Sequence, residues 1–253
     1  DLEKLISQPT EKIDRSLILL QDAFTSFYES QILSEFYALL CKLDFNVFVA
    51  PFHPNGKPLH VKGFLNQFRD VAEKNTKWLT RLASCGVPLV GLEPSVVLTY
   101  RDEYLQILGQ EQLPFEVFLP QEFLINKREK LRNYKISTKI NDYQLLGHCT
   151  EMSNSQESQD QWRDLFNLFG LSLRIIEVGC CGMAGTFGHE TEHYEESLGI
   201  YNLSWKDKMP ADSFLKQNIL TTGFSCRSQV MRIEGFRPLH PLQALLREIK
   251  FTN

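Results

Sequence analysis

The sequence predicts an α/β protein built from two similar lobes, each with a mainly parallel sheet, over residues 1–135 and 136–253. Two observations support this fold class. Short apolar segments, typical of buried parallel strands, alternate with longer segments in which apolar residues recur at helical spacing. The second half of the chain also repeats the order of the first at a nearly constant offset, as a duplication would.

The first lobe begins with a strand over residues 15–22, an apolar run that ends at polar residues. A helix follows over residues 30–43, because apolar side chains recur there every three to four positions. The next strand covers residues 46–50 and ends at a turn-prone stretch rich in Pro, Asn and Gly. A helix over residues 64–83 then leads to a third strand at residues 88–92.

The second lobe is predicted to repeat this order and to end in one more helix, which His240 caps. The strands are expected at residues 143–148, 172–177 and 218–223, and the helices at residues 159–169, around 189–201, and 241–249. The run Lys127-Arg128-Glu129-Lys130 is expected to be a solvated helix face.

The repeat has a defined register. Residues 45–56 align with residues 171–182 at an offset of 126 (182 − 56), and the offset grows to 130 (226 − 96) further along the chain. Four cysteines of the second lobe therefore align with residues that are not cysteine in the first lobe. The aligned pairs are Cys149 with Ala23, Cys180 with Pro54, Cys181 with Asn55, and Cys226 with Val96.

These four cysteines each follow a predicted strand, so a parallel sheet should bring them to the same edge. Four thiols there suit a soft metal centre, either an iron-sulfur cluster or zinc. Structural zinc sites usually take cysteines two to four residues apart, so the adjacent pair Cys180-Cys181 favours a cluster. Gly182 and Gly185, in the loop behind the pair, free the backbone to present amide N–H groups to sulfur. The other two cysteines, Cys41 and Cys85, are expected to be ordinary core residues.

Other polar residues leave alternatives open. His189 and His193 fit the bare zinc-protease pattern H-E-x-x-H, and their spacing puts both imidazoles on one helix face. A protease also needs a third ligand and a long active-site helix, so we expect both histidines to pack near the cluster or to donate to it. Arg227 either offsets the negative charge of a thiolate-bound cluster or is simply solvated. Two further alternatives are a zinc-stapled docking module and a thiol-disulfide enzyme that uses Cys180 and Cys181.

Composition narrows the function classes. Lys and Arg number 27 and Asp and Glu 31, for a formal net charge of −4, and no long basic run occurs, so we expect no nucleic-acid partner. No apolar stretch approaches the roughly 20 residues that span a bilayer. Six cysteines are too few for a disulfide scaffold, which favours a reducing cytoplasm. The first residues contain neither an initiator Met nor an apolar signal core, and we expect the chain to be part of something longer.

Several separated motifs resemble the cysteine-rich CCG domain. The second lobe carries Gly179-Cys180-Cys181-Gly182-Met183-Ala184-Gly185-Thr186-Phe187-Gly188, then Glu190, Glu192-His193-Tyr194 and Gly223-Phe224-Ser225-Cys226-Arg227. The first lobe carries Lys57-Pro58-Leu59, Lys62-Gly63-Phe64, Gly91-Leu92-Glu93-Pro94-Ser95 and Arg101-Asp102-Glu103. The likeness spans nearly the whole chain. It is to the copy found at the C-terminus of large bacterial FAD-linked oxidases, of the D-2-hydroxyglutarate and D-lactate dehydrogenase type, and heterodisulfide reductase carries a related pair in one of its polypeptides.

The resemblance implies an iron-sulfur module, of the 4Fe-4S type, that oxidises no substrate itself. Cys149, Cys180, Cys181 and Cys226 would hold the cluster, with His148, Gly182, Gly185, His189, His193 and Arg227 around it. Electrons would come from FAD bound upstream in the same polypeptide, which would also contain a ferredoxin-like domain, and would pass to an electron acceptor. The enzyme as a whole would oxidise a D-2-hydroxy acid, in the cytoplasm or at the periphery of the inner membrane.

The sequence departs from the family pattern at two places. The first copy usually keeps cysteines where this chain has Pro54, Asn55 and Val96, so we expect no second cluster. A histidine commonly follows the cysteine at the Cys149 position, and here that residue is Thr150. His148 is then the only imidazole beside the ligand.

Overall fold

The computed structural model describes residues 2–7, 13–134 and 142–249. The chain divides into two compact units, Asp1–Asn126 and Lys127–Asn253. Each unit is an α/β structure around a parallel sheet, which confirms the predicted fold class. The sequence places the boundary at residue 135, whereas the structure groups residues 127–134 with the second unit. No helix of the described residues combines the length and apolar character that a bilayer crossing requires.

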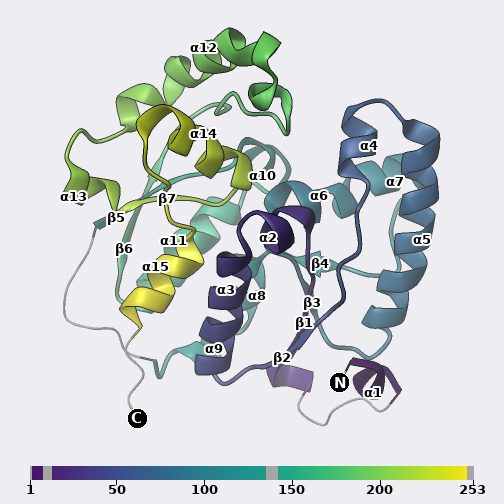
Figure 1. Ribbon diagram of the computed structural model, residues 1–253. Coiled ribbons are helices and arrows are strands. Elements are labelled where there is room, and N and C mark those ends of the chain that lie inside the picture. The colour runs from purple at the N-terminus through teal and green to yellow at the C-terminus, as the bar shows by residue number, and fades with distance from the viewer. Residues whose placement is uncertain (1, 8–12, 135–141, 250–253) are drawn as a thin grey trace. The chain divides into compact units, whose positions relative to one another are not determined.

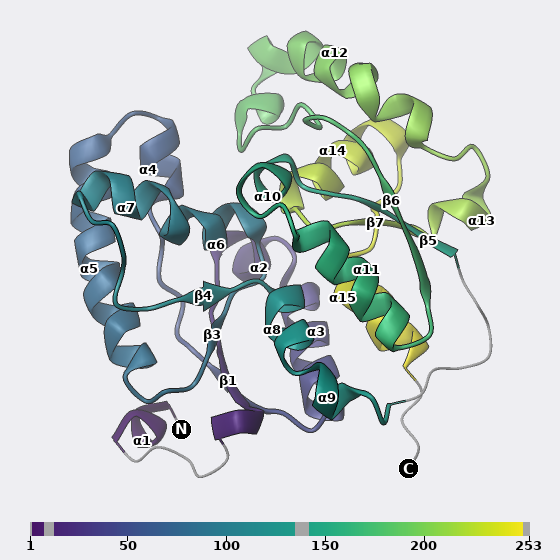
Figure 2. The same ribbon diagram turned by 180° about the vertical axis from the view of Figure 1, so that it is seen from behind.

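The sheet of the first unit has the strand order β2-β1-β3-β4, and all of its strand pairs are parallel. Helices α3 and α8 lie on one side of this sheet and α4, α5 and α7 on the other (Figures 1 and 2). The strands are β1 (Ser16–Leu19), β2 (Asn46–Val49), β3 (Leu89–Val90) and β4 (Val117–Phe118). The helices are α1 (Leu2–Ser7), α2 (Ala23–Phe27), α3 (Ser30–Lys42), α4 (Lys57–Val61), α5 (Leu65–Ala83), α6 (Pro94–Arg101), α7 (Glu103–Leu108) and α8 (Pro120–Asn126), with a 3-10 turn at Ile13–Arg15.

The sheet of the second unit has the order β6-β5-β7, again parallel, and Leu239 adds a parallel bridge to Leu220 of β7. Helices α11 and α15 lie side by side on one side of this sheet, and α12 and α14 lie on the other (Figures 1 and 2). The strands are β5 (Asp142–Leu146), β6 (Ser172–Ile176) and β7 (Ile219–Thr221). The helices are α9 (Arg128–Leu131), α10 (Cys149–Asn154), α11 (Ser158–Leu168), α12 (Tyr194–Ser204), α13 (Ser213–Lys216), α14 (Phe224–Glu234) and α15 (Pro241–Glu248), with 3-10 turns at Phe187–His189, Thr191–His193 and Lys206–Lys208.

The two units repeat the same strand order at the predicted offsets. β1 and β5 begin 126 residues apart (142 − 16), as do β2 and β6 (172 − 46). β3 and β7 begin 130 residues apart (219 − 89), which matches the insertion seen in the sequence. In both units the first strand lies inside the sheet, the second strand (β2 or β6) pairs with it on one side, and the third (β3 or β7) pairs with it on the other. The two units therefore have the same topology.

Most predicted elements are confirmed, and the predicted cap of the last helix is among them. The backbone N–H of Leu242 donates to His240 Nδ1 at 3.1 Å, and the N–H of His240 donates to the Gln243 side chain at 2.9 Å. This reciprocal pair satisfies donors at the first turn of α15 that have no partner within the helix.

Two predictions are wrong. Cys41 is exposed because it follows Tyr37 by four residues on the outer face of α3, while the buried face carries Phe36 and Leu40. The helix expected around residues 189–201 begins only at Tyr194, because the backbone is extended at Glu190 and the residues before α12 form two 3-10 turns. Cys85 is buried, as predicted.

Candidate metal centre

Three loops at the carboxyl edge of the second sheet carry the four cysteines of the second repeat. Cys149 is the first residue of α10, the helix that follows β5, and His148 is the N-cap of this helix. Cys180 and Cys181 lie in the loop that follows β6, and Cys226 lies in the first turn of α14, which follows β7. Since the strands are parallel, all three loops leave the sheet at the same edge.

The four thiols come together there as a chain of neighbours. Cys180 is within hydrogen-bonding reach of Cys149 and of Cys181, and Cys181 is within reach of Cys226. Cys181 and Cys226 are buried, whereas Cys149 and Cys180 are half-buried. The structure thus brings together all four cysteines that the sequence singles out.

These contacts shift the acidity of the thiols. Hydrogen bonds from Cys149 and then from Cys181 lower the pKa of Cys180 far below its ordinary value. The same bonds, together with burial, raise the pKa of Cys149 and of Cys181. Cys180 is therefore the sulfur on which a thiolate is most stable in the metal-free protein.

The spacing of the sulfurs bears on what they can hold. A tetrahedral zinc site with Zn–S bonds of about 2.3 Å puts its sulfurs about 3.8 Å apart. Among the residues that the structure describes, no three of these four sulfurs lie within 4.8 Å of one another. Their arrangement is therefore more open than a preformed one-ion tetrahedron.

The loop behind the cysteine pair points backbone donors at the sulfurs. The N–H of Gly182 donates to Cys180 Sγ at 3.4 Å, and the N–H of Met183 donates to Cys181. Gly182 has φ of +86°, and a Cβ there would lie 3.1 Å from the carbonyl carbon of Ser197 and closer still to its oxygen. Only glycine fits both constraints, so the turn that presents these donors depends on Gly182. Gly185 also has a positive φ, of +71°, but a Cβ there would meet open space.

His148 and Arg227 flank the thiols from inside the protein. His148 is buried, its imidazole packs on Gly223, and its charge lowers the pKa of Cys180. Arg227 is only 1% exposed, so the solvated alternative is wrong. Its guanidinium donates to the carbonyl oxygens of Thr221 at 3.1 Å and Thr222 at 3.0 Å, at the end of β7. It therefore adds a buried positive charge beside a predicted ligand, Cys226.

A buried carboxylate that the sequence reasoning missed links two of the cysteine loops. Glu151, two residues after Cys149, accepts hydrogen bonds from the hydroxyl groups of Ser158 and Thr222. The N–H of His148 in turn donates to Thr222 Oγ1 at 3.4 Å. These bonds join the start of α10 to the end of β7. Glu151 is only 1% exposed, but nothing in its spacing distinguishes it from a surface glutamate, so the sequence held no signal for it.

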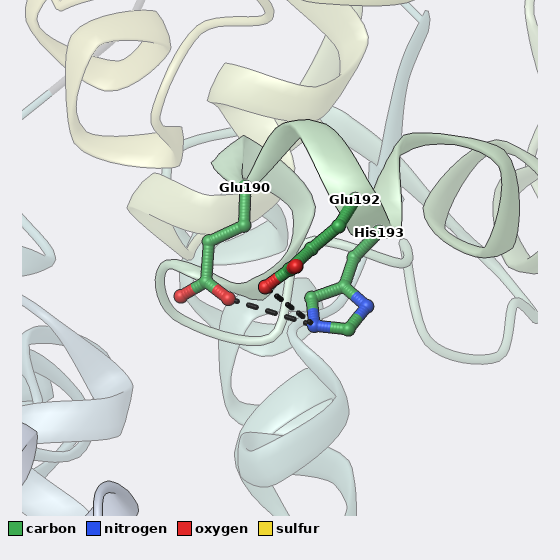
Figure 3. Close-up of side chains that lie close together, drawn as sticks. All are labelled: Glu190, Glu192 and His193. Carbon is green, nitrogen blue, oxygen red and sulfur yellow. Dashed lines mark ion pairs between the residues drawn. The ribbon is translucent and has the colours of Figure 1, made fainter.

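The two histidines of the H-E-x-x-H segment do not share a helix face. The extended backbone at Glu190 separates the turns that carry them, and His189 is exposed. His193 stacks on Phe187, with ring centroids 4.2 Å apart. Figure 3 shows its Nε2 facing two carboxylates, at 3.6 Å from Glu190 and 3.8 Å from Glu192. One ligand atom from each of these three half-exposed side chains lies within 4.8 Å of the other two, which is close enough for a shared ion. The segment lacks the long helix of a zinc protease.

The first unit shows what fills the same edge when thiols are absent. Asn55, which aligns with Cys181, is buried, and its Nδ2 donates to the carbonyl oxygen of Val96 at 3.5 Å. Val96 aligns with Cys226, so the same two positions meet in both units. Tyr104 donates to the Asn55 carbonyl oxygen at 2.8 Å, and Asn75 donates to that of Pro54 at 2.8 Å. An amide thus replaces one of the thiols, and hydrogen bonds from Tyr104 and Asn75 to backbone carbonyls hold the loop in place.

Fold and site together define a class of protein: a duplicated α/β structure in which one copy gathers four thiols, two of them buried, at the carboxyl edge of its sheet. Such a cluster can bind a soft metal centre or undergo thiol-disulfide chemistry.

Comparison with known proteins shows similarity to parts of oxidoreductases. The chain is 45% identical over 249 residues to the D-2-hydroxyglutarate dehydrogenase of Escherichia coli (strain K12), covering 98% of this chain and 24% of the relative. It is 44% identical over 246 residues to that of Pantoea ananatis (strain AJ13355), covering 97% and 24%. One polypeptide of the anaerobic glycerol-3-phosphate dehydrogenase of Escherichia coli (strain K12) is 24% identical over 196 residues, covering 75% and 48%. No protein-family model matches the chain.

The chain therefore spans about a quarter of the length of the D-2-hydroxyglutarate dehydrogenases that it matches. The predicted likeness to 2-hydroxy-acid dehydrogenases is confirmed, and the relatives that the chain matches are enzymes.

Proposed function

We propose that this chain is the iron-sulfur electron-transfer module of an FAD-linked D-2-hydroxy-acid dehydrogenase. Cys149, Cys180, Cys181 and Cys226 would be the ligands. The observation that carries the proposal is the meeting of these four thiols, far apart in sequence, at one edge of one sheet. When bound, an iron-sulfur cluster accepts and releases single electrons, and the protein tunes its potential.

The residues around the thiols fit such a group. The amide N–H groups of Gly182 and Met183 already point at sulfur, and hydrogen bonds of this kind raise a cluster's potential. Arg227 and His148 supply positive charge or donors on the buried side, where a thiolate-bound cluster would carry negative charge.

The chain's own residues also divide the site into a dry side and a wet side. Cys181 and Cys226 belong to an apolar core that includes Met183, Tyr201 and Trp205, which excludes water from that side. Cys149 and Cys180 are half-buried, so electrons would enter or leave on their side. The first unit, with Asn55 and Val96 at the corresponding positions, would hold no cluster and would serve as scaffold.

The electrons would come from another part of the polypeptide, as the likeness to longer dehydrogenases suggests. FAD on an upstream part of the polypeptide would take hydride from a D-2-hydroxy acid, and a ferredoxin-like domain and this module would relay the electrons to an acceptor. The chain covers about a quarter of these relatives, which supports a division of labour within a longer polypeptide.

The test is iron and acid-labile sulfide analysis of the full-length protein purified without air, with Cys226→Ser as the variant and Cys85→Ser as its control. Both cysteines are buried, but Cys85 lies in the first unit and its Sγ donates to the carbonyl oxygen of Leu82 at 3.0 Å, which a serine can also do. We expect wild type and Cys85→Ser to carry iron and sulfide with a visible absorbance band, and Cys226→Ser to lose most of both.

A kinetic arm separates electron relay from substrate oxidation. In Cys226→Ser, a D-2-hydroxy acid should still bleach the flavin, while reduction of an external acceptor slows. Colourless wild-type protein with stoichiometric zinc would contradict the proposal in favour of a zinc staple. Rapid alkylation of all four thiols in the intact anaerobic protein would contradict it in favour of thiol-disulfide chemistry.

A further inference from the structure

Both backbone groups of Gly179, the residue directly before the cysteine pair, are held by the end of α12. The N–H of Gly179 donates to Ser204 Oγ at 2.9 Å. Its carbonyl oxygen accepts from Trp205 Nε1 at 3.0 Å. Ser204 is the last residue of α12, and the indole of Trp205 is fully buried. Two consecutive side chains thus fix the peptide units on either side of Gly179, one residue before Cys180.

The same helix also contacts Gly182, the residue directly after the cysteine pair. The carbonyl group of Ser197, in the middle of α12, lies where a Cβ of Gly182 would be. Gln229 Nε2, on α14, donates to the Ser197 carbonyl oxygen at 3.3 Å and to its Oγ at 3.0 Å. Since α14 carries Cys226, α12 ties the loop of Cys180 and Cys181 to the helix of the fourth thiol.

The first unit holds its corresponding loop in a similar way although it has no thiols there. His53 aligns with Gly179 at the offset of 126, and it stacks on Trp78 of α5 with centroids 3.9 Å apart. Asn75, also of α5, holds the carbonyl oxygen of Pro54, which aligns with Cys180. A tryptophan further along the chain, Trp78 within α5 and Trp205 at the end of α12, therefore contacts the same loop position in both copies. Holding this loop is a property of the fold and does not require a metal.

We propose that Ser204 and Trp205 are positioning residues that keep the loop of Cys180 and Cys181 in its metal-binding shape before any metal arrives. The consequence for the metal rests on the proposed function, whereas the consequence for the loop does not.

The variant that tests this is Trp205→Phe, which removes the indole donor and keeps an aromatic ring. Trp162→Phe is a matched control, because Trp162 is also buried in the second unit but its Nε1 has no hydrogen-bond partner among the described residues. Both changes remove the same atoms from a packed interior, and only Trp205→Phe also removes a hydrogen bond. Ser204→Ala and Ser204→Thr form a second pair, in which threonine keeps the hydroxyl acceptor.

The first measurement uses the full-length protein stripped of metal. Iodoacetamide labelling of Cys180, followed by mass spectrometry, reports how often the loop opens. Loss of one hydrogen bond predicts labelling about two- to tenfold faster in Trp205→Phe and in Ser204→Ala. Trp162→Phe and Ser204→Thr should stay near the wild-type rate. Equal rates in Trp205→Phe and Trp162→Phe would overturn the proposal.

The second measurement follows anaerobic reconstitution with iron and sulfide. Trp205→Phe should lose iron to a chelator about two- to tenfold faster than Trp162→Phe. Its cluster should also have a more negative midpoint potential and altered electron paramagnetic resonance, because a loosened loop donates less well to sulfur. An unchanged potential and loss rate would overturn the metal part. Wild type that takes up no iron and sulfide would contradict the proposed function, and the labelling arm would still decide the role of the two side chains in the loop.

Discussion

Replacing Gly223 by alanine should loosen the site from its buried side. Gly223 precedes α14 and packs against the His148 imidazole. A Cβ on Gly223 would lie 2.8 Å from His148 Cγ and 3.1 Å from Nε2, and closer still to Cδ2. Ordinary contacts begin at 3.4 Å, so the ring must move by at least 0.6 Å (3.4 − 2.8). The backbone adds no strain, because φ of −95° and ψ of 140° are open to any residue.

The ring has little room to move. His148 is 5% exposed, and its backbone N–H is bonded to Thr222. Overpacking in such a setting costs about 1–3 kcal/mol of unfolding free energy. Displacing His148 also moves Cys149, its neighbour in the chain, and we expect the variant to bind less metal.

Hydrogen exchange followed by mass spectrometry measures this locally, in peptides from α10 and α14. A loss of about 1–3 kcal/mol corresponds to exchange about 5- to 150-fold faster. The control is Gly199→Ala, because Gly199 lies within α12 and a Cβ there meets nothing within 4 Å. Alanine in a helix interior should stabilise by about 0.5–1 kcal/mol, which is the opposite sign. Exchange in Gly223→Ala at the wild-type rate would refute the packing argument.

Three further predictions concern stability. Burial, and then the charge of Arg227, lowers the pKa of His240, so the folded chain keeps this imidazole neutral while the unfolded chain binds a proton below about pH 6.5. The contribution of His240 to the unfolding free energy is complete above that pH and falls as the pH drops, by up to about 1.4 kcal/mol per pH unit. His240→Asn keeps a capping acceptor but does not titrate. It should therefore flatten the pH dependence of the unfolding free energy, measured in urea between about pH 7.5 and 5.5. Tyr143→Phe removes a buried 2.7 Å hydrogen bond to Glu248 and should cost about 1.5–3 kcal/mol; a value near zero, measured by the same unfolding assay, would contradict that. Cys41→Ser, on the exposed face of α3, should change neither metal content nor unfolding free energy beyond about 0.5 kcal/mol.

The parts of the fold that could be predicted are those whose burial leaves a pattern in the sequence. β5 and β6 each contain three apolar residues among five, and α5 keeps one apolar face, so each was found within a residue or two. The helix α14 gave no such signal, because its residues from Phe224 to Val230 are all buried and polar types occur among them. β4 has only two residues, too few to show alternation.

The site divides in the same way. Convergence of the cysteines could be predicted, because strand order alone brings the three loops to one edge. The partners that hold them could not. Glu151 reaches Thr222 across 71 residues and Trp205 reaches Gly179 across 26, and a single sequence does not show which distant side chains meet. The prediction for Cys41 is wrong for a local reason. Apolar residues occur around most of α3, so the sequence does not show which face points outward.

The first unit is the strongest argument that the edge exists independently of its ligand. Asn55 and Val96 meet there as Cys181 and Cys226 do, and Gly56 and Gly182 take the same left-handed turn, with φ of +79° and +86°. A metal cannot be what brings the first set of loops together, because an amide and a backbone carbonyl hold them. By the same reasoning the second set should assemble before it binds anything. Cys226→Ser should therefore lose most of its metal while hydrogen exchange in β5 and β7 stays near the rate of metal-free wild type. Exchange there that rises to the rate of global unfolding would mean instead that the thiols hold this edge together.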